Sequence, residues 1–153
     1  MSAKIPARAI VTRQFNAPAE RVFDAWLHPH VLDQWMFGPA VRDEEIVHLA
    51  VDPRVGGAFS FLVQRGEEEI DHVGKYLELA RPRRLVFTWM VVGAAVGSRV
   101  LVDIDPREPG CELRLTHELH PDWAGFIGQA EASWRKMLDA LAVALADAKT
   151  SRR

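Results

Sequence analysis

The chain of 153 residues has one cysteine, no surplus of either charge and no long hydrophobic run. The single cysteine, Cys111, excludes an intrachain disulfide and suits a reducing compartment. Nineteen basic residues against 21 acidic ones leave no excess to neutralise phosphates, so we expect no nucleic-acid partner. No apolar run approaches the roughly 20 residues of a membrane span, and the N-terminus lacks the apolar core of a signal peptide. We therefore expect a cytoplasmic protein with no membrane span.

The composition that is present is that of an ordinary globular domain, with 48% hydrophobic and 26% charged residues. A chain of this length can bury about 68–70% of its unfolded surface. Since no repeat, linker or low-complexity segment divides the sequence, we expect one domain over residues 1–153, with its core at 9–148.

The N-terminal part of the chain combines a strand with two short helices. Ala9–Phe15 is apolar and β-branched, which predicts a strand. Pro18 and Glu20 are typical of the first turn of a helix, and apolar residues follow at helical spacing. Pro29 ends that helix, and Pro29–Trp35 predicts a second short one.

The middle of the chain predicts six further strands, which are Val41–Asp52, Ala58–Gln64, Glu69–Leu79, Arg84–Met90, Ser98–Ile104 and Glu112–Leu119. The Pro- and Gly-rich connections are too short for crossover helices, so the strands should be antiparallel. Alternation places Leu113, Leu115 and His117 together on an inner face. In Glu69–Leu79 the inner face stays open, because both of its faces carry apolar residues.

The segment from Trp123 to about Ala148 predicts one long helix of about 38 Å. Its apolar positions recur at steps of three and four, namely Phe126, Ile127, Ala130, Trp134, Met137, Leu138, Leu141 and Leu145. No other element is long enough to cover one face of the sheet, so the sheet should curve around this helix. Such an arrangement leaves an incompletely filled interior, and we expect a partly apolar cavity there.

Five short motifs follow one another along the chain. They are Phe15-x-Ala17-Pro18-x-x-x-Val22-Phe23-x-Ala25-Trp26, Trp35-Met36-Phe37-Gly38-Pro39, Asp52-x-Arg54-x-Gly56-Gly57, Gly74-x-Tyr76-x-Glu78 with Pro82-x-Arg84-Leu85-Val86-Phe87-Thr88-Trp89, and Ser133-Trp134-x-x-x-Leu138-x-x-Leu141. Together they resemble the START-like, or helix-grip (SRPBCC), superfamily, and within it the branch of heat-shock-protein-90 ATPase activator homologues. Two positions depart from the pattern: Met36, at an expected pocket edge, where tryptophan is common, and Ser133, where glycine is usual.

The resemblance implies an α+β helix-grip fold, in which a curved antiparallel sheet of about six to seven strands wraps around the long C-terminal helix. Two short helices would follow the first strand. The superfamily includes lipid carriers, hormone receptors, polyketide cyclases and chaperone cofactors, so the fold alone does not choose a function.

The sequence carries no clear catalytic or metal-binding motif. His117 and His120 lack the spacing and helical context of a HExxH zinc site, and no cluster of Cys, Asp or His supplies an obvious third ligand. No predicted base accompanies Cys111. We therefore assign no catalytic residue, metal or cofactor. His117 on the inner face could orient a ligand, act as an acid or base, or be a hydrogen-bonded core histidine.

Aromatic residues are the strongest indication of a binding site. The residues expected to line the cavity are Trp35, Phe61, Tyr76, Trp89, His117, Ile127 and Trp134. The preferred hypothesis is binding of a small apolar or amphipathic molecule. The alternatives are an enzyme of cyclase or hydratase type that uses His117 and Tyr76, and a chaperone-cofactor-like protein interaction implied by the resemblance alone. The apolar segment Val91–Gly97 could be a lid, a strand extension or a patch for a homodimer.

Overall fold

The structure, a computed structural model, describes residues 7–37, 44–94 and 97–151, with side chains described to residue 146. Seven strands form one antiparallel sheet in the order β1-β7-β6-β5-β4-β3-β2. The strands are β1 (Ala7–Phe15), β2 (Glu45–Val51), β3 (Ala58–Arg65), β4 (Glu68–Ala80), β5 (Arg84–Val91), β6 (Ser98–Arg107) and β7 (Gly110–Leu119). The helices are α1 (Ala19–Asp24), α2 (Pro29–Trp35), the short 3₁₀ helix η1 (Pro121–Phe126) and α3 (Ile127–Ser151).

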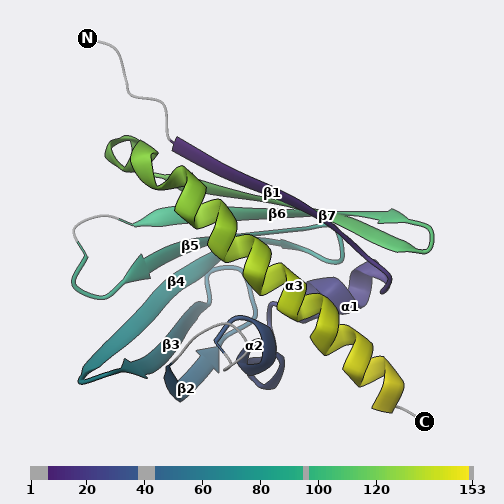
Figure 1. Cartoon of the computed structure of the whole chain (residues 1–153), viewed down its shortest axis with the longest axis horizontal. Coiled ribbons are helices and arrows are strands. Elements are labelled where there is room, and N and C mark those ends of the chain that lie inside the picture. Colours follow the sequence, from purple (N-terminus) through teal and green to yellow (C-terminus); the bar gives the residue numbers. More distant parts are fainter. Residues whose placement is uncertain (1–6, 38–43, 95–96, 152–153) are drawn as a thin grey trace.

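The sheet curves around α3, which crosses it diagonally, while α1 and α2 lie beside the C-terminal half of α3 (Figure 1). Along the chain, β2 to β7 each pair with the preceding or following strand, and β1 pairs with β7 at the far edge. In the part of the chain that the structure describes, no helix is both long and apolar enough to cross a membrane. This arrangement confirms the predicted α+β helix-grip fold.

The core lies between the sheet and the helices, as the alternation predicted. Leu113 and Leu115 of β7 are fully buried, and so are Leu138 and Leu141 of α3. Both sets belong to the same cluster of buried residues. Burial of these large aliphatic side chains stabilises the sheet against the helix by about 1.5–3 kcal/mol for each.

β4 explains why its inner face could not be predicted from alternation. Its pairing with β5 shifts between Tyr76 and Glu78, which marks a β-bulge. Tyr76 lies opposite Phe87 before the bulge, and Leu79 lies opposite Leu85 after it. Residues at even-numbered and odd-numbered positions of β4, such as Tyr76 and Leu79, therefore both contribute to the core, while Leu77 within the bulge is 46% exposed.

An ion pair and a glycine hold the turn between β2 and β3. Arg54 Nε lies 2.9 Å from Asp52 Oδ2, which fixes the turn. Gly56 has φ +85°, a conformation that favours glycine. Of the strand expected from Val41, residues 41–43 lie outside the described residues, and β2 begins at Glu45.

The prediction that the last helix begins near Trp123 was wrong. A 3₁₀ helix runs over Pro121–Phe126, and α3 begins only at Ile127. The His120 side chain caps the start of the 3₁₀ helix, because its Nδ1 accepts a hydrogen bond from the Asp122 N–H at 3.1 Å. Trp123 has φ −100° and ψ 18°, which interrupts helical geometry. As a result, Trp123 and Phe126 are 40% and 55% exposed instead of facing the core.

Candidate functional site

Aromatic side chains from β3, β4 and β5 form a continuous cluster on the inner face of the sheet. Phe59 stacks on Phe61 with ring centroids 4.7 Å apart, and its ring also lies within 6 Å of Tyr76 and Phe87. Gly74 of β4 makes room for this cluster, because a Cβ atom there would overlap the Phe59 ring. The glycine in the Gly74-x-Tyr76 motif thus has a packing role.

A cavity lies in this cluster, but it is small, and no residue of α3 lines it, although the expected cavity lay between the sheet and that helix. Its volume is about 10 Å³, close to the smallest that can hold one water molecule. The residues that line it come from β3, β4, β5, α2 and the turn after α1, and they are Trp26, Leu32, Met36, Phe59, Phe61, Tyr76, Phe87 and Trp89. The lining is almost entirely aromatic and aliphatic, which is typical of a site for an apolar molecule.

One polar group on this lining has no partner. The Nε1–H of Trp26 is buried and has no hydrogen-bond acceptor among the residues that the structure describes. The neighbouring tryptophan Trp35, whose ring packs edge-on against Trp26 at 4.7 Å, donates its own Nε1–H to the Ala25 carbonyl at 3.1 Å. A buried donor without an acceptor costs about 1–3 kcal/mol. Trp26, one of the residues that line the cavity, therefore has an unused donor.

Tyr76 supplies a second polar group on the same wall. Burial, together with the nearby Asp52 carboxylate, raises the pKa of its phenol well above the usual value. The hydroxyl keeps its proton at neutral pH, as an unperturbed tyrosine also does, and it can act as a hydrogen-bond donor.

His117 belongs to a chain of hydrogen bonds beside the cavity. Because the indole Nε1–H of Trp134 can only donate, His117 Nδ1 accepts from it, at 3.1 Å. The ring proton then lies on Nε2, which donates to Ser98 Oγ at 2.7 Å, and the Ser98 hydroxyl donates to the Trp89 carbonyl at 3.1 Å. Burial lowers the pKa of His117 to about 4. The imidazole is thus neutral at pH 7, and both of its nitrogens are occupied by protein groups.

The structure places three of the seven expected lining residues on the cavity wall and two more beside it. Phe61, Tyr76 and Trp89 line the cavity directly. The hydrogen-bonded pair of His117 and Trp134 adjoins them, since the Trp134 and Trp89 rings lie 6.5 Å apart.

The other two expected residues lie apart from the cavity wall. Trp35 is fully buried but packs against Trp26 and does not line the cavity. Ile127 is half-buried at the start of α3 and is also absent from the lining.

Sequence reasoning did not select four residues that line the cavity, Trp26, Leu32, Phe59 and Phe87, and it named Met36 only as a pocket edge. Trp26 and Met36 were visible as members of motifs, but their positions on a common wall depend on how α1 and α2 pack on the sheet. Phe59 shares the alternation of Phe61 and could have been found from it.

Other candidate chemistry is not assembled in the described residues. Cys111 is buried, and burial together with the nearby Glu20 raises the pKa of its thiol, which disfavours the reactive thiolate. Within residues 7–37, 44–94 and 97–151, no three His, Cys, Asp or Glu side chains gather in a metal-binding group.

Comparison with known proteins agrees with this geometry. The family described as Activator of Hsp90 ATPase homolog 1-like protein matches residues 16–146. No curated protein matches the sequence. A solved structure from Nitrosomonas europaea is 19% identical, has a TM-score of 0.80, and the match covers 98% of this chain and 99% of that one.

Two further solved structures have the same fold. One from Chromobacterium violaceum is 26% identical with a TM-score of 0.76, over 89% of this chain and 94% of its own. The AHSA1-like protein from Aeromonas hydrophila is 22% identical with a TM-score of 0.77, and the match covers 95% of this chain and 96% of that one. Since the family match spans most of the sequence, the chain belongs to the Activator of Hsp90 ATPase homolog 1-like family and has the START-like helix-grip fold.

Proposed function

We propose that the protein binds a small apolar or amphipathic molecule in the interior between the sheet, α2 and α3. The observation that carries this proposal is the buried, unpartnered Nε1–H of Trp26 on the wall of an aromatic cavity. The ligand would carry one hydrogen-bond acceptor for Trp26, and the Tyr76 hydroxyl would offer a second polar contact. Few polar groups in an apolar lining are typical of small-molecule sites.

Binding requires the cavity to enlarge, because about 10 Å³ holds no more than one water molecule. Leu32 of α2 and Met36 directly after it form the aliphatic part of the wall. Methionine has three rotatable bonds and readily adopts new packing. α2 itself has only seven residues, and its N-cap, His28, makes no side-chain capping bond. Movement of α2 and of the Met36 side chain would thus open the site while the aromatic sheet face stays in place.

Two probes of nearly equal shape test the proposal: acetophenone, which carries a carbonyl acceptor, and α-methylstyrene, in which a CH₂ group replaces the carbonyl oxygen and no acceptor is left. We expect the wild-type protein to bind acetophenone more tightly, by about five- to tenfold, since one hydrogen bond contributes about 1 kcal/mol. Trp26→Phe should abolish this preference. The matched variant Trp35→Phe should keep it, because the Trp35 N–H already has an acceptor in the protein.

The affinities would be measured by calorimetry on the full chain. The proposal would be wrong if the wild type bound neither probe, or if the preference for acetophenone persisted unchanged in Trp26→Phe. Native mass spectrometry of the purified protein would add an independent test, because a co-purifying small molecule supports binding.

A second candidate function, a protein interaction, is favoured by one observation outside the interior. Exposed Trp123 and Phe126 border a shallow apolar hollow of about 550 Å³, together with Leu119 and Ala130. Contiguous exposed apolar side chains are typical of interaction sites. The family description names an activator of the Hsp90 ATPase, so the corresponding partner would be Hsp90.

The interaction hypothesis is tested by the rate of ATP hydrolysis by Hsp90 with and without this protein. We expect stimulation that is lost in the double variant Trp123→Ser, Phe126→Ser. No stimulation by the wild-type chain would exclude this candidate, and it would leave the interior ligand site unaffected.

A further inference from the structure

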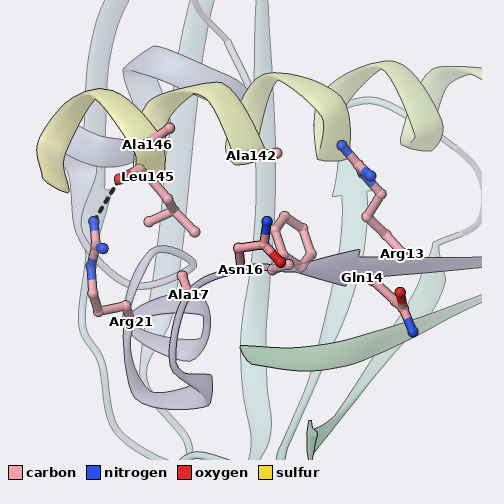
Figure 2. A pocket seen from close by; sticks show the side chains of 9 residues that line it. Arg13, Gln14, Asn16, Ala17, Arg21, Ala142, Leu145 and Ala146 are labelled. Carbon is pink, nitrogen blue, oxygen red and sulfur yellow. Dashed lines mark hydrogen bonds between the residues drawn. The ribbon is translucent and has the colours of Figure 1, made fainter. Parts of the chain in front are cut away.

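A further pocket, separate from the aromatic cavity and from the hollow at Trp123 and Phe126, lies where the end of β1, the turn into α1 and the C-terminal half of α3 meet (Figure 2). Its volume is about 350 Å³, near the lower end of the range for small-molecule sites. It shares no lining residue with the aromatic cavity. We call it the β1–α3 pocket and define it by Arg13, Phe15, Asn16, Arg21, Ala142 and Leu145.

Two arginines reach into this pocket from different elements. Arg13 comes from β1 and Arg21 from α1, and Figure 2 shows the Asn16 side chain between them. Arg21 Nη2 donates to the Leu145 carbonyl at 2.9 Å, a neutral acceptor that occupies one of its five N–H donors. No carboxylate pairs with Arg21 in the part of the chain that the structure describes. Its positive charge is therefore not neutralised there.

Arg13 is only partly neutralised. Its guanidinium lies over the Phe15 ring, 5.7 Å from the centroid, which holds it at the pocket. Its Nε is 3.1 Å from Asp139 Oδ1, yet it makes no well-oriented hydrogen bond. The Asp139 side chain is 69% exposed, so this ion pair contributes little and can be displaced.

The floor of the pocket is apolar. Phe15, Ala17 and Leu145 are buried, and Ala142 is half-buried. Cationic guanidinium groups above an apolar floor match a molecule with an anionic end and a compact apolar body. A planar guanidinium also pairs with a carboxylate through two parallel hydrogen bonds.

We propose that the β1–α3 pocket binds a small organic carboxylate. The carboxylate would pair with Arg21, while Arg13, at the other end of the pocket beside Asp139, would add positive charge. The apolar part would pack on Phe15 and Leu145. If Arg21 served only to hold the Leu145 carbonyl, the charge of the ligand would not affect binding.

The test compares phenylacetate with its neutral counterpart phenylacetamide, using the full chain at low salt. We expect phenylacetate to bind at least tenfold more tightly and to weaken as sodium chloride is added. Arg21→Gln keeps a donor for the Leu145 carbonyl but removes the charge, and it should abolish the preference. Asp139→Asn should strengthen phenylacetate binding, because it removes the negative charge that partly neutralises Arg13 at this pocket.

Arg107→Gln is the matched control, since Arg107 pairs with Asp105 and Glu112 in the β6–β7 hairpin and should not affect binding. The proposal is overturned if phenylacetate does not bind, or if Arg21→Gln retains the preference. If Arg21→Gln does not fold, failure of Asp139→Asn to strengthen binding overturns it equally. If phenylacetate binding were lost in Trp26→Phe but kept in Arg21→Gln, phenylacetate would bind in the interior. That result would contradict the β1–α3 pocket proposal and leave the proposed interior site standing.

Discussion

Two tryptophans lie side by side in the interior, with ring centroids 5.9 Å apart, and each is only 3% exposed. They differ in what their N–H groups do. The Trp134 N–H begins a hydrogen-bond chain through His117 and Ser98 that uses both imidazole nitrogens. The Trp26 N–H has no acceptor in the described residues. The two rings are equally buried, so the proposed ligand site rests on the unpartnered N–H of Trp26 and not on burial.

The largest effect that would test this comparison is expected from Trp134→Ala. The change removes a large buried ring and leaves His117 Nδ1 without its donor, so the free energy of unfolding should fall by about 3–5 kcal/mol. Urea unfolding measures it, with exposed Lys136→Ala on the same helix as a control expected within about 0.5 kcal/mol. A loss below about 1 kcal/mol would show that the His117 chain is not a structural unit.

Acid should destabilise the protein through the same histidine. Above pH 6.5, His117 is neutral in both the folded and the unfolded state. As the pH falls below 6.5 the unfolded state takes up a proton that the folded state accepts only near pH 4, so stability is lost across this window. The loss attributable to His117 is about 3 kcal/mol. It is measured as the difference between the pH profiles of the wild type and His117→Gln, and parallel profiles would contradict the assignment.

A pair of phenylalanine substitutions compares the two tryptophans directly. Trp134→Phe should cost about 1–3 kcal/mol more than Trp26→Phe, because only the first leaves a buried nitrogen without its partner. Chemical unfolding of both variants under one condition gives the difference. Equal losses would mean that the Trp26 N–H has an acceptor in solution, which would remove the basis of the proposed ligand site.

The smallest effect is expected at the end of the hydrogen-bond chain. Ser98→Ala removes the acceptor of His117 Nε2–H and should lower the free energy of unfolding by about 1 kcal/mol. Ser133→Ala is the control, since Ser133 is exposed on α3 and alanine favours helices. A stability change for Ser98→Ala no different from that of Ser133→Ala would show that this bond contributes nothing.

Much of the fold followed from alternation and spacing, because most predicted strands have one apolar face and the connections between strands are short and Pro- or Gly-rich. Leu113, Leu115 and His117 were placed correctly for this reason. Two features resisted prediction. The bulge at Tyr76 changes the facing of β4 part-way along, and the 3₁₀ helix after Pro121 turns Trp123 outward although its spacing fits a helix.

The hydrogen bonds of the site depend on side-chain orientation and on the register between strands. Neither can be predicted from the periodicity of the sequence. Ser98 meets His117 across β6 and β7 and could have been proposed only once the register was known. The contrast between Trp26 and Trp134 depends on which way each indole points. Arg13 and Arg21 are indistinguishable in sequence from solvated surface charges, and only the packing of α3 on β1 brings them to one pocket.

The most direct test of the central claim observes the tryptophan N–H groups themselves. In protein labelled with ¹⁵N-tryptophan, the indole signal of Trp26 should shift progressively and saturably as acetophenone is added, since a new acceptor reaches it. The indole signal of Trp35 should keep its bonded position throughout. If the Trp26 signal did not move while acetophenone bound, or if none of the indole signals responded at any concentration, Trp26 would not be the donor of an interior ligand site.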